Sequence, residues 1–205
     1  MKNKIVFISA LVLFSLFFTS RIVAQTALLD SIALFELDGY TDLAEAIKHP
    51  ESVIKLELHK TKLKVFPPEI LKMVNLQYLD LSKNNIKEIP PEIGELKNLQ
   101  YLSLSKNKLE DLPIQIGDLT NLYYFNANQN DLYSLPSTIG NLINLRNIDL
   151  WSNNIDKFPT EMKNLKNLQM LDLRVIVIPD AEQARLQGLL PQTKIFFSPF
   201  CKCQQ

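Results

Sequence analysis

The chain has 205 residues, of which 46 % are hydrophobic, and its 22 basic side chains balance its 22 acidic ones. This length and this apolar content are enough for one well-buried domain and exclude an intrinsically disordered chain. The balanced charge excludes the strongly basic surface that nucleic-acid binding demands, so no nucleic-acid partner is expected.

Residues 1–24 have the pattern of a signal peptide. Lys2 and Lys4 precede a predominantly apolar run at 5–18, which is short for a membrane span but fits the apolar core of an export signal. We expect cleavage between Ala24 and Gln25, and an uncleaved N-terminal anchor is the alternative. Cleavage leaves 19 basic and 22 acidic side chains, a net charge of about −3. No second apolar stretch approaches spanning length, so we expect no membrane insertion after cleavage.

Residues 25–51 are expected to form an N-terminal capping segment. Leu43, Ala46 and Ile47 recur at helical spacing within residues 41–48 and are followed by Pro50, which favours a short helix that ends before the proline. Residues 26–39 are also compatible with a helix, but the sequence does not place them against the rest of the domain.

Residues 52–178 are built from a 23-residue repeat. Five full units occupy 52–166 and a degenerate sixth follows. A period of this length is typical of a solenoid, in which a unit cannot bury its apolar side alone and its neighbours supply the core. The framework of the clearest copy, residues 75–97, is Leu76, Leu79, Leu81, Asn84, Ile86, Ile89, Pro90, Ile93 and Leu96.

Each class of repeat position has a physical reason. The apolar–polar alternation of Leu79-Asp80-Leu81 predicts a short strand, and stacked identical units place such strands in parallel. The recurring asparagine follows the strand, where a buried amide can satisfy backbone groups of two adjacent coils. The recurring proline forbids a long helix, which leaves room for about one helical turn. The two columns are Asn84, Asn107, Asn130 and Asn153, and Pro67, Pro90, Pro113, Pro136 and Pro159.

The repeat degenerates at its ends, and residues 179–198 are expected to be a C-terminal cap. Asp180 and Gln183 resemble a capping box that starts a helix running to Leu190, and a strand at 193–197 would shield the last edge. Residues 199–205 form a tail that holds Cys201 and Cys203. A disulfide across one residue is strained, so pairing with another chain, a weak metal site and a frayed tail without a role all remain open.

These motifs resemble the leucine-rich repeat family, specifically its 23-residue class with Leu-Pro-x-x-Ile-Gly-x-Leu in the second half. The resemblance covers residues 40–198 and implies an α/β solenoid, a curved right-handed superhelix capped by short helices. Its concave face would be a parallel β-sheet, and its convex side would carry short turns or helices. Similar repeats occur in exported proteins of Gram-negative bacteria and in intracellular eukaryotic ones. The export signal favours the former, in the periplasm, on the cell surface or secreted.

Outward-facing strand positions are the candidate binding surface. Tyr78, Tyr101 and Tyr124 share one repeat position and should form a stacked stripe, with Trp151 on the same face and Tyr123 and Met170 nearby. Tyrosine and tryptophan are enriched at binding hot spots, although tyrosine as a mere filler is the alternative. The predicted partner-binding residues are Tyr78, Tyr101, Tyr124, Asn126, Asn128, Asn147, Asp149, Trp151 and Met170.

Acidic residues also recur on this face. Glu57 should lie beside Asp80, and Asp149 beside Asp172. Like charges on neighbouring strands are unfavourable, so a counter-charge is expected. A basic partner, a divalent cation, or simply the nearby lysines and Arg174 would supply it.

Catalysis is not expected. The two histidines, His49 and His59, accompany no nucleophile at a recognisable spacing, and five glycines provide no phosphate-binding loop. The family resemblance supplies no catalytic residues, and neither a cofactor nor a resident metal is predicted. The sequence therefore favours a monomeric, non-catalytic module that binds a protein or peptide partner on its concave sheet. The alternative is a structural or adhesive envelope protein that acts through self-association.

Overall fold

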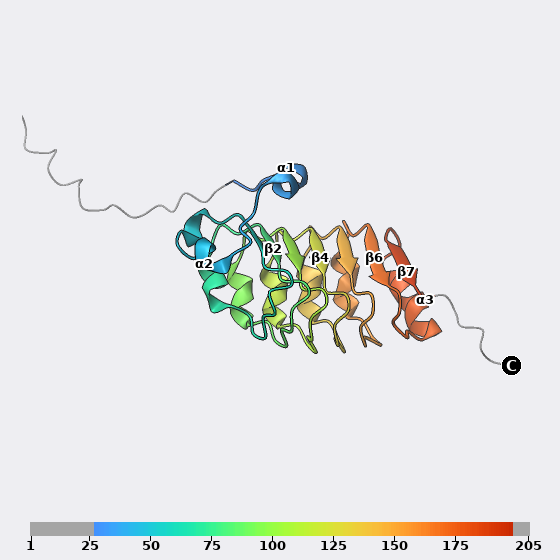
Figure 1. Cartoon of the computed structure of the whole chain (residues 1–205). Helices are drawn as coiled ribbons and strands as arrows, with labels where there is room; N and C mark the ends of the chain where they lie inside the picture. The colour runs from blue at the N-terminus through green and yellow to red at the C-terminus, as the bar shows by residue number, and fades with distance from the viewer. Residues whose placement is uncertain (1–26, 199–205) are drawn as a thin grey trace, which may run out of the picture.

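The computed structural model describes residues 27–198, so the predicted signal peptide and the two cysteines lie outside the described residues. Within 27–198 the chain is a stack of coils whose strands form a parallel sheet in sequence order (Figure 1). From β1 to β6, each strand residue pairs with the residue 23 positions later. The strands are β1 (Lys55–Glu57), β2 (Tyr78–Asp80), β3 (Tyr101–Ser103), β4 (Tyr124–Asn126), β5 (Asn147–Asp149), β6 (Met170–Leu173) and β7 (Lys194–Phe197).

The opposite side of each repeat coil is a 3-10 helix that follows a proline. Pro90, for example, is extended at φ −70° and ψ 151° immediately before η3 (Pro91–Glu95). The proline ring fixes φ near this value and removes the N–H donor, so the helix begins only after it. The prediction of about one helical turn is confirmed by η2 (Pro68–Lys72), η3, η4 (Ile114–Asp118), η5 (Ser137–Asn141) and η6 (Thr160–Asn164), which a shorter η1 (Pro50–Ser52) precedes.

The apolar framework side chains fill the space between the sheet and the 3-10 helices. Leu76, Leu79, Leu81, Ile86 and Ile93 are all fully buried. The same positions in every coil join into a cluster that runs from Ala46 to Leu190. Each fully buried aliphatic side chain stabilises the fold by about 1.5–3 kcal/mol, so the stack is held together mainly by contacts between neighbouring coils, as the repeat predicted.

The asparagine column forms a ladder of buried amides. Asn107 Nδ2 donates to the carbonyl oxygens of Leu81 and Leu104, both at 3.0 Å, and its Oδ1 accepts from Ile86 N at 3.0 Å. Leu81 and Ile86 belong to the preceding coil, so the amide links two coils, which confirms the predicted role. Asn84, Asn130 and Asn153 repeat the pattern.

The N-terminal cap contains α1 (Ser31–Glu36) and α2 (Leu43–Ala46). The predicted helix within 41–48 is confirmed in α2, where Asp42 Oδ1 accepts from Ala44 N at 2.8 Å. Between α2 and α1, Tyr40 bridges to Leu56 and extends the first edge of the sheet. The remaining helix, α1, lies over the sheet near β2 (Figure 1), a position that the sequence did not predict.

The C-terminal cap is α3 (Asp180–Leu189) followed by β7. Leu186 and Leu190 are buried and belong to the apolar cluster. The predicted capping box is wrong. Pro179 occupies the N-cap and has no N–H to donate, and Gln183 Nε2 instead donates to Ile178 O at 2.9 Å. Within the described residues, none of the helices has the length and apolar character to cross a bilayer.

The Glu182–Arg185 ion pair fastens α3 to the fifth coil and makes stability pH-dependent. Glu182 Oε1 accepts from Phe158 N at 2.9 Å, while Arg185 donates to both Glu182 and Phe158 O. The hydrogen bonds from Arg185 lower the pKa of Glu182 below its ordinary 4.5 despite partial burial. Since the pKa is lower in the folded state, this stabilisation is complete above about pH 4.5 and is lost as the pH falls further.

We therefore expect Glu182→Gln to lower the free energy of unfolding by about 1–2 kcal/mol at pH 7. Urea denaturation at several pH values should show this difference shrinking below pH 4.5. As a control, Glu161→Gln removes an exposed carboxylate without an ion pair in the described chain and should cost less than about 0.5 kcal/mol. A difference for Glu182→Gln that stays constant down to pH 3 would contradict the role of the charge.

Candidate partner-binding surface

The outward-facing side chains of the sheet form aligned rows, which we call together the sheet face. The strand register pairs equivalent residues of neighbouring coils, so the predicted alignment is confirmed. The first row is Lys55, Tyr78, Tyr101, Tyr124, Asn147 and Met170, and the second is Glu57, Asp80, Ser103, Asn126, Asp149 and Asp172. A third row, Ser82, Ser105, Asn128, Trp151 and Arg174, follows the strand ends.

The three tyrosines of the first row form a parallel stack. The ring centroids of Tyr78 and Tyr101 lie 4.1 Å apart with an interplanar angle of 2°, and those of Tyr101 and Tyr124 lie 4.5 Å apart at 1°. Burial raises the pKa of Tyr78 to about 12 and also raises the pKa values of Tyr101 and Tyr124. All three phenols therefore stay neutral and remain hydrogen-bond donors at physiological pH.

Tyr78 is not an accessible contact residue, which corrects the sequence-based assignment. It is only 6 % exposed, whereas Tyr101 and Tyr124 are half-buried. Lys55 Nζ lies 4.8 Å from the centroid of the Tyr78 ring and donates to Phe35 O at 2.9 Å. This bridge ties the end of α1 to the first strand and closes the stack at that end, so Tyr101 and Tyr124 are the members open to a partner.

The second row serves the turns that end the strands. The Oδ1 atoms of Asp80, Asn126, Asp149 and Asp172 each accept from the backbone N–H two residues later, at 2.8–3.1 Å. In each coil the residue after that N–H has a positive φ, between 52° and 59° across the repeats. Short polar side chains stabilise such turns. Asn126 and Asp149, predicted to contact a partner, therefore also hold the backbone in place.

The chain itself supplies a counter-charge to two of the acids on this face, Glu57 and Asp172. Arg174 pairs with Asp172 at 2.6 Å, and Lys55 lies 4.0 Å from Glu57. Asp149 accepts from Asn128 Nδ2 at 2.6 Å. Between residues 27 and 198 no three His, Cys, Asp or Glu side chains gather in a group that could hold a metal ion.

The other predicted contact residues lie toward the C-terminal half of the sheet face. Trp151 and Asn147 are half-buried, and Met170 is 39 % exposed. Asn128 Oδ1 is buried and has no hydrogen-bond partner within the described residues. Together with Tyr101 and Tyr124, Trp151, Asn147 and Met170 give the sheet face both apolar and polar accessible area.

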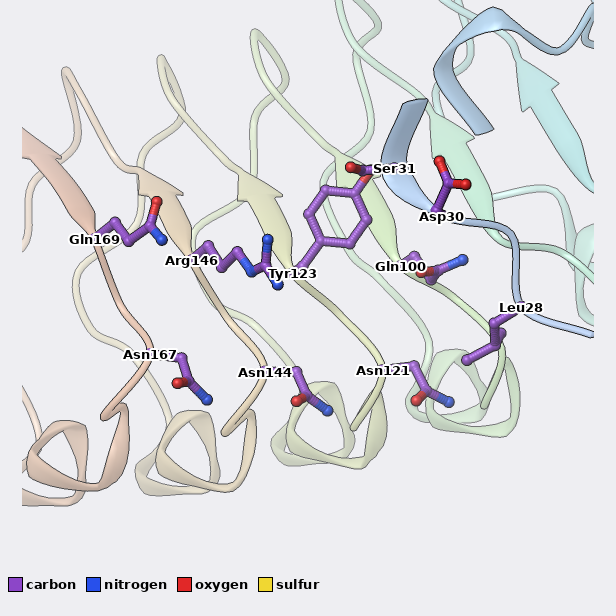
Figure 2. Close-up of a pocket in the computed structure, with 10 residues that line it drawn as sticks. All are labelled: Leu28, Asp30, Ser31, Gln100, Asn121, Tyr123, Asn144, Arg146, Asn167 and Gln169. Atoms are coloured by element: carbon purple, nitrogen blue, oxygen red, sulfur yellow. The ribbon is translucent and has the colours of Figure 1, made fainter. Parts of the chain in front are cut away.

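Sequence reasoning missed a fourth row, which lies just before the strands. Gln100, Tyr123, Arg146 and Gln169 follow one another across the coils, and Asn121, Asn144 and Asn167 form a parallel row beneath them (Figure 2). Tyr123, expected near Trp151, points toward Ser31 of α1 (Figure 2). The repetition of long polar side chains at one repeat position was visible in the sequence and is the signal that could have found this row.

These features define a class of protein, a repeat solenoid in which every unit carries a short strand, an asparagine turn and a 3-10 helix. The family described as a leucine-rich repeat region matches residues 52–190. The chain therefore belongs to the leucine-rich repeat family. A search of curated proteins found no match.

Solved structures agree with this assignment. A leucine-rich repeat protein of Leptospira interrogans is 36 % identical, with a TM-score of 0.56 over 66 % of this chain and 41 % of that one. The plant peptide hormone receptor RGFR1, solved in complex with RGF2, is 34 % identical, with a TM-score of 0.62 over 72 % of this chain and 24 % of the receptor. Internalin C2 of Listeria monocytogenes, 24 % identical with a TM-score of 0.66, shares the fold over 78 % of this chain and 67 % of its own. This chain thus spans less than half of the first two.

Proposed function

We propose that this protein is a non-catalytic binding module that recognises a protein or peptide partner through the sheet face. The observation that carries the proposal is the open end of the tyrosine stack, where Asn147 and Met170 follow Tyr101 and Tyr124 along the first row. Trp151 lies in the third row of the same face. The backbone beneath these side chains is fixed by the asparagine ladder and the strand-end turns. A preformed surface loses little ordering entropy on association, so its aromatic side chains can contribute fully to affinity.

The comparisons support this proposal. The leucine-rich repeat family is generally non-catalytic, and the related plant receptor RGFR1 was solved with RGF2 bound. We further propose that the mature protein is exported, in the periplasm, on the surface or in the medium of a Gram-negative bacterium. The signal-like residues 1–24 motivate this part. An alkaline phosphatase fused after residue 205 should be active only outside the cytoplasm, and inactive fusions would contradict export.

The double substitution Tyr124→Ala with Trp151→Ala should abolish partner capture. It removes two rigid amphipathic contacts, and hot-spot residues of this kind cost about 2 kcal/mol or more each when truncated. Affinity capture from the native envelope and medium with the wild-type and variant chains, followed by mass spectrometry, measures the effect. The loss of ring stacking should lower the free energy of unfolding by only about 0.5–1.5 kcal/mol.

The matched control is Tyr133→Ala, which removes an exposed tyrosine outside the strands. Capture by this variant should equal that of the wild type. Equal capture by the double variant and the wild type would refute the sheet face as the recognition surface.

A further inference from the structure

The fourth row, to which Gln77 also belongs, already binds one stretch of polypeptide, the start of the described chain. Gln77 Oε1 accepts from Leu29 N at 2.9 Å, and Gln77 Nε2 donates to Ala27 O at 3.2 Å. One coil further on, Gln100 Nε2 donates to Leu29 O at 3.0 Å. The residues at 27–29 therefore run across the coils and are held through backbone groups rather than through their side chains, a mode of recognition that does not depend on sequence.

The fourth row continues past Gln100, which is the last of its side chains to hold residues 27–29. At Asp30 the backbone turns away into α1, with Asp30 Oδ1 accepting from Ile32 N and Ala33 N at 2.9 Å. Tyr123, Arg146 and Gln169 then line a pocket of about 680 Å³ that begins beside Asp30 (Figure 2). From Gln100 to Gln169 is three strand spacings, about 14 Å, the length of about four extended residues.

One charge in this pocket has no counterpart. Arg146 makes no ion pair within residues 27–198. The carboxylate lining the same pocket, that of Asp30, is engaged as the N-cap of α1. A planar guanidinium favours bidentate contact with a carboxylate. The pocket is therefore complementary to an acidic group.

A second, apolar pocket opens between α1 and the tyrosine stack. Its volume is about 470 Å³, and Ile32, Phe35, Tyr101 and Tyr124 line it. Ile32 is 69 % exposed and Phe35 70 % exposed, although Leu34 of the same helix is fully buried. Ser31 and Tyr123 line both pockets, so the polar and the apolar parts adjoin.

We propose that the N-terminal segment 27–36 is one wall of a composite groove that takes an acidic, extended peptide. This inference rests on the proposed function and specifies its ligand. The peptide runs along the row from Tyr123 to Gln169, places a carboxylate against Arg146, and inserts a large apolar side chain between Phe35 and the tyrosine stack. Glu36 lines the apolar end, so its charge disfavours a second acidic group there and sets the direction of binding.

The experiment uses a displayed library of random 12-residue peptides, panned on the mature chain. The enriched peptides are then synthesised and titrated calorimetrically into the wild type, Arg146→Gln and Phe35→Ser. We expect the enriched peptides to share an Asp or Glu and a large apolar residue, and both variants to weaken Kd at least tenfold. Salt raised from 50 to 500 mM should weaken binding to the wild type and have little effect on Arg146→Gln.

Matched controls separate the groove from the general surface. Lys166→Gln and Ile143→Ser alter exposed residues outside both pockets and should leave Kd within twofold. Peptides that bind both groove variants as tightly as the wild type would overturn the inference, and so would a library without any binder. Neither result overturns the proposed function if Tyr124 and Trp151 are still required for partner capture. If Tyr124 and Trp151 prove unnecessary for partner capture, the proposed function itself is wrong.

Discussion

Replacing Asn107 with alanine should lower the free energy of unfolding by about 2–4 kcal/mol. The substitution leaves Ile86 N without its acceptor. It also removes one of the two amide donors to Leu81 O and to Leu104 O, which keep Asn84 Nδ2 and Asn130 Nδ2. A buried polar group that loses its hydrogen bond costs about 1–3 kcal/mol, and a turn inside the apolar cluster offers little access to water. Urea denaturation followed by circular dichroism measures the change.

The chain provides a matched asparagine as the control. Asn144 Nδ2 also donates to a backbone oxygen of the preceding coil, that of Thr120 at 2.8 Å, but this side chain is exposed. Because water replaces the lost partner, Asn144→Ala should cost less than about 1 kcal/mol. Similar losses of stability for Asn107→Ala and Asn144→Ala would show that burial does not determine how much the buried amides stabilise the fold.

The part of this structure that repeats was predictable from the sequence. A constant period of 23 residues converts sequence position directly into place in the stack, so Tyr78, Tyr101 and Tyr124 had to become neighbours once one coil was understood. The same reasoning placed Asn107 inside and Met170 outside. No long-range contact had to be guessed, because each coil packs mainly on its neighbours.

The part that does not repeat was not predictable. The position of α1 depends on a few amide contacts from Gln77 and Gln100 and on the bridge from Lys55 to Phe35 O. Glutamine and lysine make such contacts with any backbone, so their identity does not indicate which segment they hold. This segment buries Tyr78 and so limits the accessible part of the candidate site. The burial could not be derived from the first row alone.

Local chemistry was partly misread for a related reason. The acids of the second row were interpreted as outward charges, whereas Asp80 and Asp149 each close a turn with the N–H two residues on. The spacing of a short polar residue two positions before a left-handed turn residue was a usable signal. Residue identity gives the charge of a side chain, but only the backbone path shows which donor lies within its reach.

Gly117, in the Ile-Gly-x-Leu part of its repeat, lies where η4 closely approaches η5. A Cβ on Gly117 would lie 2.3 Å from Thr138 O and 2.5 Å from Thr138 Cβ, in the next 3-10 helix. A backbone oxygen cannot move aside as a flexible side chain can, so η4 and η5 would have to separate. We expect Gly117→Ala to lower the free energy of unfolding by about 2–3 kcal/mol, at the upper part of the range for overpacking.

Gly188, in α3, is a second glycine that tests whether the destabilisation by Gly117→Ala comes from steric overlap or from the change in backbone freedom. Apart from its chain neighbours and the backbone of its own helix, no atom lies within 4 Å of the position of its Cβ. Within residues 27–198 no glycine has a positive φ. Gly188→Ala should therefore raise the free energy of unfolding by about 0.4–1 kcal/mol, because alanine restricts the unfolded chain and favours the helix. Thermal and urea denaturation of the two variants should give opposite signs. A stabilised Gly117→Ala would show that the coils can separate freely, and the close stacking that aligns the sheet face would then not depend on this glycine.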